Sequence, residues 1–225
     1  MCVESRSSWA ALCIDTSPTL EILFKKIHIA FTQSKYDMIA GCDEAGAGPG
    51  FGDLVASAVI LTTPIEGLTD SKKLSEKKRD AYFKQIAESC IFGIGRVSNL
   101  EIDQRGLAWA RRIVFHRALD DMMTRTSTLP EYIIVDGTIF EPWRNISFEC
   151  KPKADLTDAC VSAASIVAKV TRDQSIYDLC DAHPWLDEQY GLRSNKGYLS
   201  APKHKEGLRK FGLTDWHRKS YNIKL

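Results

Sequence analysis

The sequence predicts an α/β domain in which a mixed sheet of five strands is flanked by helices, with a small helical segment at the C-terminal end. Its 225 residues, 44% of them hydrophobic and 26% charged, suffice for one globular domain with a sizeable core. From Met38 onwards, short apolar stretches alternate with turn residues, and helical patterns are interleaved between the later ones. Strands first and helices interleaved afterwards are typical of a mixed sheet covered by helices.

Five stretches have the composition of strands. Residues 38–42 are apolar and end at a glycine-rich turn, and residues 54–61 (LVASAVIL) are apolar throughout, as in a well-buried strand. Residues 91–97 and 132–135 are short and rich in apolar and β-branched side chains. In residues 146–151 apolar and polar side chains alternate with the period of two that a strand requires.

Four segments have helical patterns. Residues 75–88 form the first, and the second repeats apolar residues at i, i+3, i+7, i+11 and i+15 from Leu107. A long helix is expected after Asp155. Residues 202–211 have proline in their first turn and Gly212 just beyond their end, the usual asymmetry of helix termini.

Residues 1–36 are interpreted as an N-terminal extension with one possible amphipathic helix at 20–31, and residues 37–225 as one domain. No apolar run approaches the roughly 20 residues that cross a bilayer, and residues 9–14 lack a convincing signal-peptide cleavage site. The seven cysteines are odd in number and form no C-x-x-C pair. We therefore expect a reduced, cytoplasmic protein that does not associate with membranes.

The C-terminal quarter is basic. Residues 193–219 contain eight Lys or Arg and two Asp or Glu, a local net charge of +6, whereas the whole chain carries +1. Such a segment predicts a surface that faces a polyanion, and the alternative is an ordinary solvated face.

Two adjacent acids, Asp43 and Glu44, lie where the first strand gives way to a glycine-rich turn. Their charges repel each other unless a cation is present, and Mg²⁺ prefers oxygen ligands of this kind. Since neighbouring strand residues face opposite ways, both can reach one metal only if the backbone turns at Glu44, which Gly46 would make easy. The alternative is a solvated acidic turn.

The glycines of this turn do not form a nucleotide-binding motif. In a G-x-G-x-x-G register the third glycine falls on Phe51 or on Asp53, and no Walker G-K-[ST] follows. Dinucleotide and nucleoside-triphosphate binding are therefore not expected.

Two further acids follow the same logic. Asp136 ends the fourth strand and precedes Gly137, so it also lies at a strand terminus beside a glycine. Asp155 precedes the long helix, whose second acid is Asp158. There a carboxylate can cap the helix, bind metal, or do both.

The long helix has a polar stripe at Ser162, Ser165, Lys169 and Arg172, which are spaced i, i+3, i+7 and i+10. This stripe can hydrogen-bond phosphate oxygens near the acids, or it can be an ordinary helix surface. For Asp173 we expect an ion pair with a neighbouring Lys or Arg rather than metal ligation.

Together these residues resemble one family, the type 2 ribonucleases H, and most closely its ribonuclease HII members. The similarity covers about 185 residues and keeps seven motifs in the family's order. They are GCDEAG (41–46), DSKKLS (70–75), VDG (135–137), KAD (153–155), residues 162–173, KGY (196–198) and HRKS (217–220).

The resemblance implies a ribonuclease H-like fold in residues 37–225 that binds Mg²⁺ or Mn²⁺ through Asp43, Glu44, Asp136 and Asp155. It implies hydrolysis of the RNA strand of RNA/DNA hybrids, leaving 5′-phosphate and 3′-hydroxyl ends, and leaves open cleavage 5′ of ribonucleotides embedded in DNA. It also casts Tyr198 as the residue that stacks on a deoxyribose at the RNA-to-DNA junction, where a buried structural tyrosine is the alternative.

One motif departs from the family. Ribonuclease HII members usually carry Gly-Arg-Gly after the acidic pair, whereas this chain has Gly46, Ala47 and Gly48. Ala47 keeps the backbone amides that we expect to sense the ribose 2′-hydroxyl, but it removes a guanidinium and its bidentate phosphate contact. The candidates for phosphate contacts elsewhere in the chain are Lys72, Lys73, Ser165, Lys169 and Arg172.

The predicted activity is metal-assisted phosphodiester hydrolysis by a monomer, with an RNA/DNA hybrid or ribonucleotide-containing DNA as its partner. One competing interpretation is a nucleic-acid-binding homologue with weak catalysis. Another is a different ribonuclease H-like metal nuclease, such as a DNA resolvase.

Overall fold

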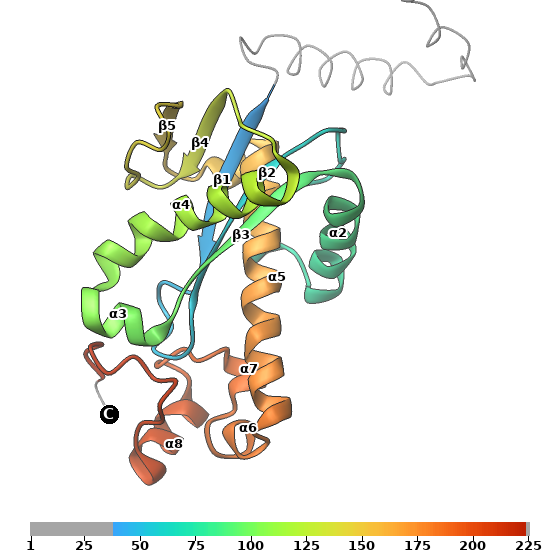
Figure 1. Cartoon of the computed structure of the whole chain (residues 1–225). Helices are drawn as coiled ribbons and strands as arrows, with labels where there is room; N and C mark the ends of the chain where they lie inside the picture. Colours follow the sequence, from blue (N-terminus) through green and yellow to red (C-terminus); the bar gives the residue numbers. More distant parts are fainter. Residues whose placement is uncertain (1–37, 224–225) are drawn as a thin grey trace, which may run out of the picture. The chain divides into compact units, whose positions relative to one another are not determined.

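The computed structural model describes residues 38–223, and the N-terminal extension expected at 1–36 lies outside them (Figure 1). One sheet contains five strands in the order β3-β2-β1-β4-β5. β1 pairs with β2 and β2 with β3 in antiparallel fashion, whereas β1–β4 and β4–β5 are parallel. The expected mixed sheet is thus confirmed. Its strands are β1 (Ile39–Ala45), β2 (Leu54–Ile60), β3 (Ile91–Val97), β4 (Tyr132–Asp136) and β5 (Ser147–Lys151).

All four expected helices are present as α2 (Glu76–Ser89), α4 (Leu107–Thr126), α5 (Ala159–Ala182) and α8 (Pro202–Phe211). Three short helices were not predicted, since fewer than eight residues give too little periodicity to detect. They are α3 (Asn99–Arg105), α6 (Trp185–Tyr190) and α7 (Leu192–Asn195). Two single-turn 3₁₀ helices, η1 (Ser71–Lys73) and η2 (Ala154–Leu156), complete the described elements.

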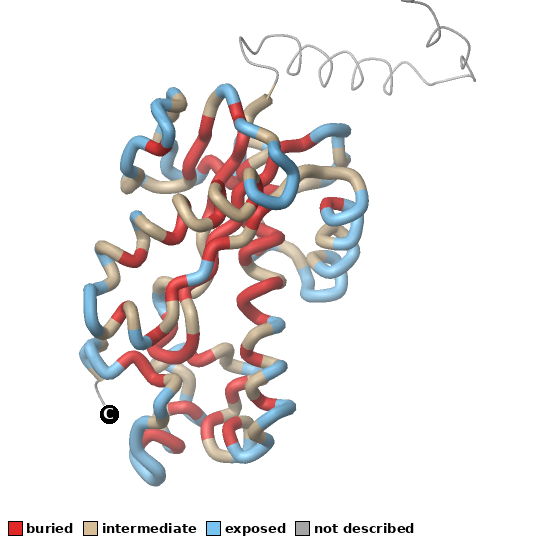
Figure 2. The backbone as a smooth tube through the Cα atoms, viewed as in Figure 1, coloured by how far each residue is buried: buried red, intermediate tan, exposed pale blue. Residues whose placement is uncertain are grey.

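Helices α4 and α5 cover opposite faces of the sheet (Figure 1). The side chains of β1 alternate between them, as strand geometry requires. Ala40 and Cys42 belong to the buried cluster that contains the apolar face of α4, while Ile39 packs with Val161 of α5. The central strands and α5 form the buried centre of the domain (Figure 2). Each residue of β1 therefore has a determined face.

Gly41 brings the first turn of α5 against β1. A Cβ at this position would lie 2.2 Å from the carbonyl carbon of Cys160 and 2.3 Å from the amide nitrogen of Val161. Only a residue without a side chain permits this approach of backbone to backbone. The contact fixes α5 beside the acids two and three residues further along β1.

The C-terminal helices form the small segment that the sequence predicts. Phe51 anchors it to the sheet by packing with residues of α5, α6, α7 and α8 in a second buried cluster. In Figure 1 these short helices surround the C-terminal end of α5. The segment is therefore part of the same packed unit.

A reciprocal capping box starts α3. The Ser98 hydroxyl accepts from the Glu101 amide (3.2 Å), and the Glu101 carboxylate accepts from the Ser98 amide (2.9 Å).

We expect Ser98→Ala to lower the free energy of unfolding by about 1 kcal/mol. The Glu101 amide loses its acceptor, and the reciprocal bond from the amide of residue 98 to the Glu101 carboxylate loses its geometry. Urea unfolding measures this. Ser75→Ala is the comparison, since the Ser75 cap on α2 is longer, at 3.4 Å, and an equal or larger loss there would contradict the capping-box argument.

Among residues 38–223, no helix is both long and apolar enough to span a bilayer. The cysteines in the same part of the chain carry free thiols.

Candidate active site

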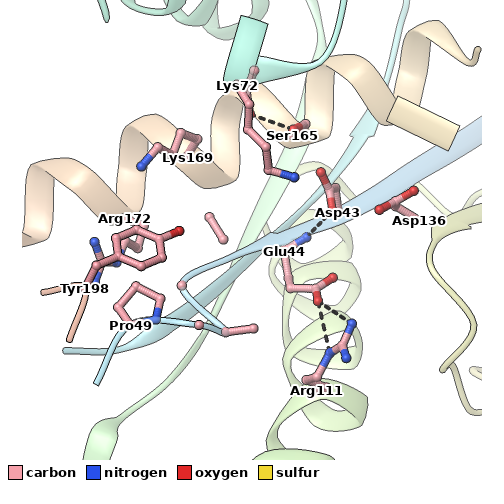
Figure 3. Close-up of a pocket in the computed structure, with 15 residues that line it drawn as sticks. Asp43, Glu44, Pro49, Lys72, Arg111, Asp136, Ser165, Lys169, Arg172 and Tyr198 are labelled. Atoms are coloured by element: carbon pink, nitrogen blue, oxygen red, sulfur yellow. Dashed lines mark hydrogen bonds and ion pairs between the residues drawn. The ribbon is translucent and has the colours of Figure 1, made fainter. Parts of the chain in front are cut away.

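A cavity of about 440 Å³ opens where β1 ends, between α4 and α5 (Figure 3). Three acids line it, Asp43, Glu44 and Asp136. The turn of residues 46–49 forms one wall. Tyr198 and four cationic side chains also line it: Lys72, Arg111, Lys169 and Arg172.

The two adjacent acids lie within β1, not after it. Asp43 pairs with Ser57 and Glu44 with Ala56 in the antiparallel ladder, so the backbone does not turn at Glu44 as expected. The turn comes two residues later, at Gly46, where φ is 99°. Strand alternation therefore sends the two carboxylates to opposite faces, with Asp43 toward α5 and Glu44 toward α4 (Figure 3).

Asp43 is almost fully buried, with 6% of its surface exposed. One carboxylate oxygen accepts the amide of Glu44 at 2.7 Å. Burial, together with the charges of Glu44 and Asp136, raises the pKa of Asp43 to about 8, while the Ser165 hydroxyl favours the anion. A cation at this position would remove the cost of keeping Asp43 ionised.

Glu44 already has a cationic partner. Burial raises the pKa of Glu44, and the charge and hydrogen bonds of Arg111 oppose that rise. The Arg111 Nε and Nη2 atoms lie 3.0 and 2.7 Å from the same oxygen, Oε1. This pair connects β1 to α4 across the edge of the cavity.

Asp136 ends β4, the parallel neighbour of β1. Because Cys42 pairs with Val135, the next residues, Asp43 and Asp136, lie at the same end of adjacent strands. One Asp136 oxygen accepts the amide of Ala154 at 2.8 Å. The fold thus brings together acids that are far apart in the chain.

Asp155 lies in η2 and is not among the residues that line the cavity. It is 5% exposed, and burial together with the charges of Asp136 and Asp70 raises its pKa, while Lys72 opposes that rise. It does not cap α5, because Asp158 does so by accepting the amides of Cys160 and Val161. Asp155 belongs instead to the 3₁₀ turn η2, which ends before the cap position.

The acid cluster fits a divalent cation in its chemistry. Buried carboxylates that repel one another are stabilised by a hard cation, which prefers oxygen ligands. In the part of the chain that the structure describes, no three His, Cys, Asp or Glu side chains are yet arranged closely enough to hold a metal. Asp43 and Glu44 extend from opposite faces of β1, and Arg111 holds Glu44 on the α4 side. Binding a metal therefore requires these carboxylates to move toward one another.

The cations differ in how freely they could reach a ligand. The charges of Asp70 and Asp43 raise the pKa of Lys72 against the opposing effect of burial. Lys169 pairs with Asp173 at 2.9 Å, which confirms the ion pair expected for Asp173. Arg172 is 1% exposed and donates to the carbonyl of Phe51 at 3.0 Å.

Besides Asp155, two residues of the sequence-based set lie outside the cavity lining. Lys73 is exposed in η1 and is not part of the lining. Ser162, in the predicted polar stripe, donates to the carbonyls of Asp155 and Asp158 at 2.7 and 2.9 Å and does not face the cavity. The neighbouring Ser165 does line it, and its hydroxyl lies 2.9 Å from that of Ser71.

Tyr198 is 48% exposed, so the alternative of a buried structural tyrosine is wrong. Its ring lies beside the glycine-rich turn, since a Cβ on Gly48 would be 3.5 Å from Tyr198 Cε1. Its backbone carbonyl lies 3.1 Å from Nδ1 of His204. A half-exposed ring beside the cavity is available for stacking.

The glycine-rich turn is held from the C-terminal segment. The carbonyl of Ala47 accepts the Tyr221 hydroxyl at 2.7 Å and Nη1 of Arg218 at 3.3 Å. At Gly46 a Cβ would lie 2.8 Å from the carbonyl oxygen of Asp53, so position 46 requires glycine for space as well as for its φ. The KGY and HRKS motifs of the sequence are thereby packed around the turn.

No sequence pattern indicates Arg111. In the chain it is one of several arginines on an amphipathic helix, 67 residues after Glu44. Only the packing of α4 against β1 reveals it as part of the cavity.

Comparison with known proteins identifies relatives of this chain. Residues 40–224 match the family model of ribonuclease HII. The ribonuclease HII of Marinomonas sp. is 44% identical over 82% of this chain and 90% of its own length. The ribonuclease HII of Clostridioides difficile is 38% identical over 97% of this chain and 87% of its own length. Among solved structures, the ribonuclease H2 of Pyrococcus horikoshii superposes with a TM-score of 0.68 at 27% identity, covering 82% of this chain and 94% of that one.

Proposed function

The chain belongs to the ribonuclease HII family, and from this premise we propose how its own residues bind and cut the substrate. It is a metal-dependent endoribonuclease that acts on RNA/DNA hybrids. The observation that supports the site is the convergence of three acids from β1 and β4 on one cavity that also carries cations. We assign the cutting of the RNA strand to this cavity, with 5′-phosphate and 3′-hydroxyl products.

In this proposal Asp43, Glu44 and Asp136 hold Mg²⁺ or Mn²⁺ directly, and Asp155 holds a second ion or positions water. The metal supplies a Lewis acid that activates water and stabilises the charge on the reacting phosphate. The protein orients the carboxylates: the Glu44 amide holds Asp43, Arg111 holds Glu44, and the Ala154 amide holds Asp136.

The substrate strand is proposed to run between the turn and α5. Backbone groups of Gly46, Ala47 and Gly48 sense the 2′-hydroxyl, and the Tyr198 ring stacks on the deoxyribose at the junction. Phosphate contacts are assigned to four polar side chains of the lining, Lys72, Ser165, Lys169 and Arg172, and to Lys73, which lies in η1 outside it.

We propose that residues 37–225 form the catalytic domain and that residues 1–36 are an extension to it. A monomer is proposed as the working unit. A cytoplasmic location is proposed from the free thiols of the described cysteines.

A substrate panel tests this function. The protein is incubated with a duplex bearing one ribonucleotide, a full RNA/DNA hybrid and a DNA four-way junction, each with Mg²⁺ or Mn²⁺, and the cut sites are mapped. Cutting of the ribonucleotide substrates with 5′-phosphate ends is expected. Cutting of the junction alone indicates a resolvase, and binding without any cutting indicates a homologue that has lost catalysis.

Removal of the Tyr198 ring is expected to weaken binding of the single-ribonucleotide duplex about tenfold, since one stacking contact contributes about 1–3 kcal/mol. Tyr198→Ala is compared with Tyr198→Phe, which keeps the ring and should bind like the wild type. Phe211→Ala is the matched control, because Phe211 is similarly exposed, at 46%, but does not line the cavity. An equal loss in Phe211→Ala would remove Tyr198 from its proposed role.

A further inference from the structure

Arg111 is positioned to do more than pair with Glu44. It extends from α4 into the cavity, and about one third of its side chain is exposed (Figure 3). A Cβ on Gly137, next to Asp136, would lie 4.0 Å from Arg111 Nη2. The guanidinium therefore lies between the ends of β1 and β4, close to two of the acids.

The guanidinium uses only one of its two edges. It carries five N–H donors arranged as a rigid fork. Nε of one edge donates to Oε1 of Glu44 at 3.0 Å, and Nη2 of the same edge forms an ion pair with that oxygen at 2.7 Å. Within residues 38–223 the other edge, formed by Nη1 and Nη2, meets no further acceptor. Arg111 can thus hold Glu44 and still offer a pair of donors to a second anion.

The turn of residues 46–49, which forms one wall of the cavity, has no side-chain donor to offer. Ala47 ends in a methyl group, and its carbonyl is already occupied by Tyr221 and Arg218. An anionic ligand at this end of the cavity would therefore meet no cation from the turn itself.

The other cations near α5 are engaged in different ways. Arg172 is buried: its Nη2 donates to the Phe51 carbonyl, while Nε and Nη1 have no hydrogen-bond partner among the described residues and Nη1 lies 3.6 Å from Asp173. Lys169 pairs with the same aspartate. Lys72 approaches from η1, on the α5 side of the sheet (Figure 3). On the α4 side, beside Glu44, Arg111 is the guanidinium of the cavity lining that has an open edge.

We propose that Arg111 is a specificity-determining residue: its open edge binds a phosphate of the substrate strand beside the ribonucleotide, while its other edge keeps Glu44 in place. It thereby takes over the contact that an arginine at position 47 would make. Two parallel N–H···O bonds to one phosphate suit a planar guanidinium that is already oriented by a carboxylate. This inference rests on the proposed function, because it requires the nucleic-acid strand to pass through the cavity.

Binding of a duplex with one ribonucleotide tests the inference without depending on turnover. Fluorescence anisotropy is measured with Ca²⁺ in place of Mg²⁺, at several salt concentrations, and a denaturing gel verifies that the duplex stays intact. For Arg111→Ala we expect about tenfold weaker binding, as for the loss of a charged hydrogen-bonded contact. The slope of log affinity against log salt should fall by about 0.9, the value for one phosphate contact.

The neighbouring arginine provides the matched control. Arg112 has the same charge and lies on the same helix, but it pairs with Glu141 at 3.4 Å, is half exposed and does not line the cavity. Arg112→Ala should leave the affinity and the salt slope unchanged. Equal changes in both variants would show only a general effect of charge and would overturn the proposal.

A double-mutant cycle tests whether positions 47 and 111 share one task. Ala47→Arg should restore affinity and salt slope in the Arg111→Ala background, yet add little to the wild type, where the contact is already made. Equal gains in both backgrounds would mean independent contacts and would overturn the inference. Arg111→Lys keeps the charge but not the fork of donors, so its affinity should lie between those of the wild type and Arg111→Ala. If the alanine variant does not fold, the lysine variant replaces it in the cycle.

Failure of the underlying function gives a different result. If the wild type neither binds this duplex better than an all-DNA duplex nor cuts it with Mg²⁺ or Mn²⁺, the proposed function itself is wrong. Wild-type binding and cutting with an unchanged Arg111→Ala variant would refute the role of Arg111 alone.

Discussion

Replacing Asp43 with asparagine is expected to lower turnover by at least ~10³-fold while making the metal-free protein more stable. The loss of activity follows because a neutral amide is a poor ligand for a hard cation, and several kcal/mol of charge stabilisation disappear with the metal. Cleavage of a ribonucleotide-containing duplex under single-turnover conditions measures it. Retention of wild-type activity would exclude Asp43 from the mechanism.

The gain in stability follows from the raised pKa. Burial and the neighbouring acids raise the pKa of Asp43 from 3.8 to about 8 in the folded protein. Between these values the folded state binds a proton that the unfolded state releases, so the stability of the metal-free protein falls as pH rises toward 8. The asparagine of the variant cannot ionise and escapes this cost. The advantage of Asp43→Asn should therefore grow by on the order of 3 to 4 kcal/mol between about pH 5 and about pH 8.

Urea unfolding in EDTA at the two pH values measures this change in the free energy of unfolding. Asp215→Asn is the control, because the Asp215 side chain is 95% exposed and its removal changes the same formal charge. Addition of Mg²⁺ or Mn²⁺ should stabilise the wild type through binding to the folded state and should have little effect on Asp43→Asn. A variant that is less stable than the wild type at both pH values would contradict the electrostatic argument.

The arrangement of the acids shows what a sequence can predict. Strand composition correctly located β1 and β4, and the placement of Asp43 and Asp136 at the same sheet end follows from their parallel pairing. The expected turn at Glu44 was wrong, because the ladder with β2 continues to Ala45 and is not interrupted by two adjacent charges. Strand periodicity was sufficient to predict opposite faces once the strand was known to continue.

Other features depend on contacts that local patterns do not encode. Asp155 and Asp158 are both plausible helix caps in the sequence, and only the structure, in which Asp155 is part of a 3₁₀ turn, assigns the cap to Asp158. Arg111 reaches Glu44 across 67 positions of the chain. Such pairs are set by how α4 packs on the sheet, which is a tertiary property.

A buried pair of histidines, His204 and His217, is another feature that local sequence patterns do not encode. The pair is hydrogen-bonded to the backbone of Tyr198. Nδ1 of His217 accepts the Thr214 amide at 2.9 Å, so the proton of this ring is on Nε2. That Nε2 donates to Nε2 of His204 at 3.0 Å, which leaves Nδ1 of His204 to donate to the Tyr198 carbonyl at 3.1 Å. The chain of bonds is complete only when both rings are neutral.

This pair is expected to make the protein less stable in mild acid. Burial, with a smaller effect of His204, lowers the pKa of His217 from 6.5 to about 3. The unfolded state takes up a proton below pH 6.5 that the folded state refuses, so the stability that His217 contributes is present above pH 6.5 and is lost as pH falls. Between about pH 7.5 and about pH 5 the loss should be about 2 kcal/mol.

Urea unfolding of the wild type and of His217→Gln at these two pH values isolates the effect. The glutamine variant can be less stable at both, but its pH dependence should be shallower by about 2 kcal/mol, because the titrating ring is gone. His116→Gln removes a histidine whose ring bonds the Glu141 carbonyl and meets Phe140 edge-on, and it corrects for the loss of any one ring. The raised pKa of Asp43 changes stability with pH in the opposite direction, and it does so equally in every variant. The test is therefore the difference in pH dependence between His217→Gln and the wild type, not the pH dependence of either protein alone. Equal pH dependence in the two proteins would mean that His217 is not held neutral, and the bonds that connect it through His204 to Tyr198 would then not form as described.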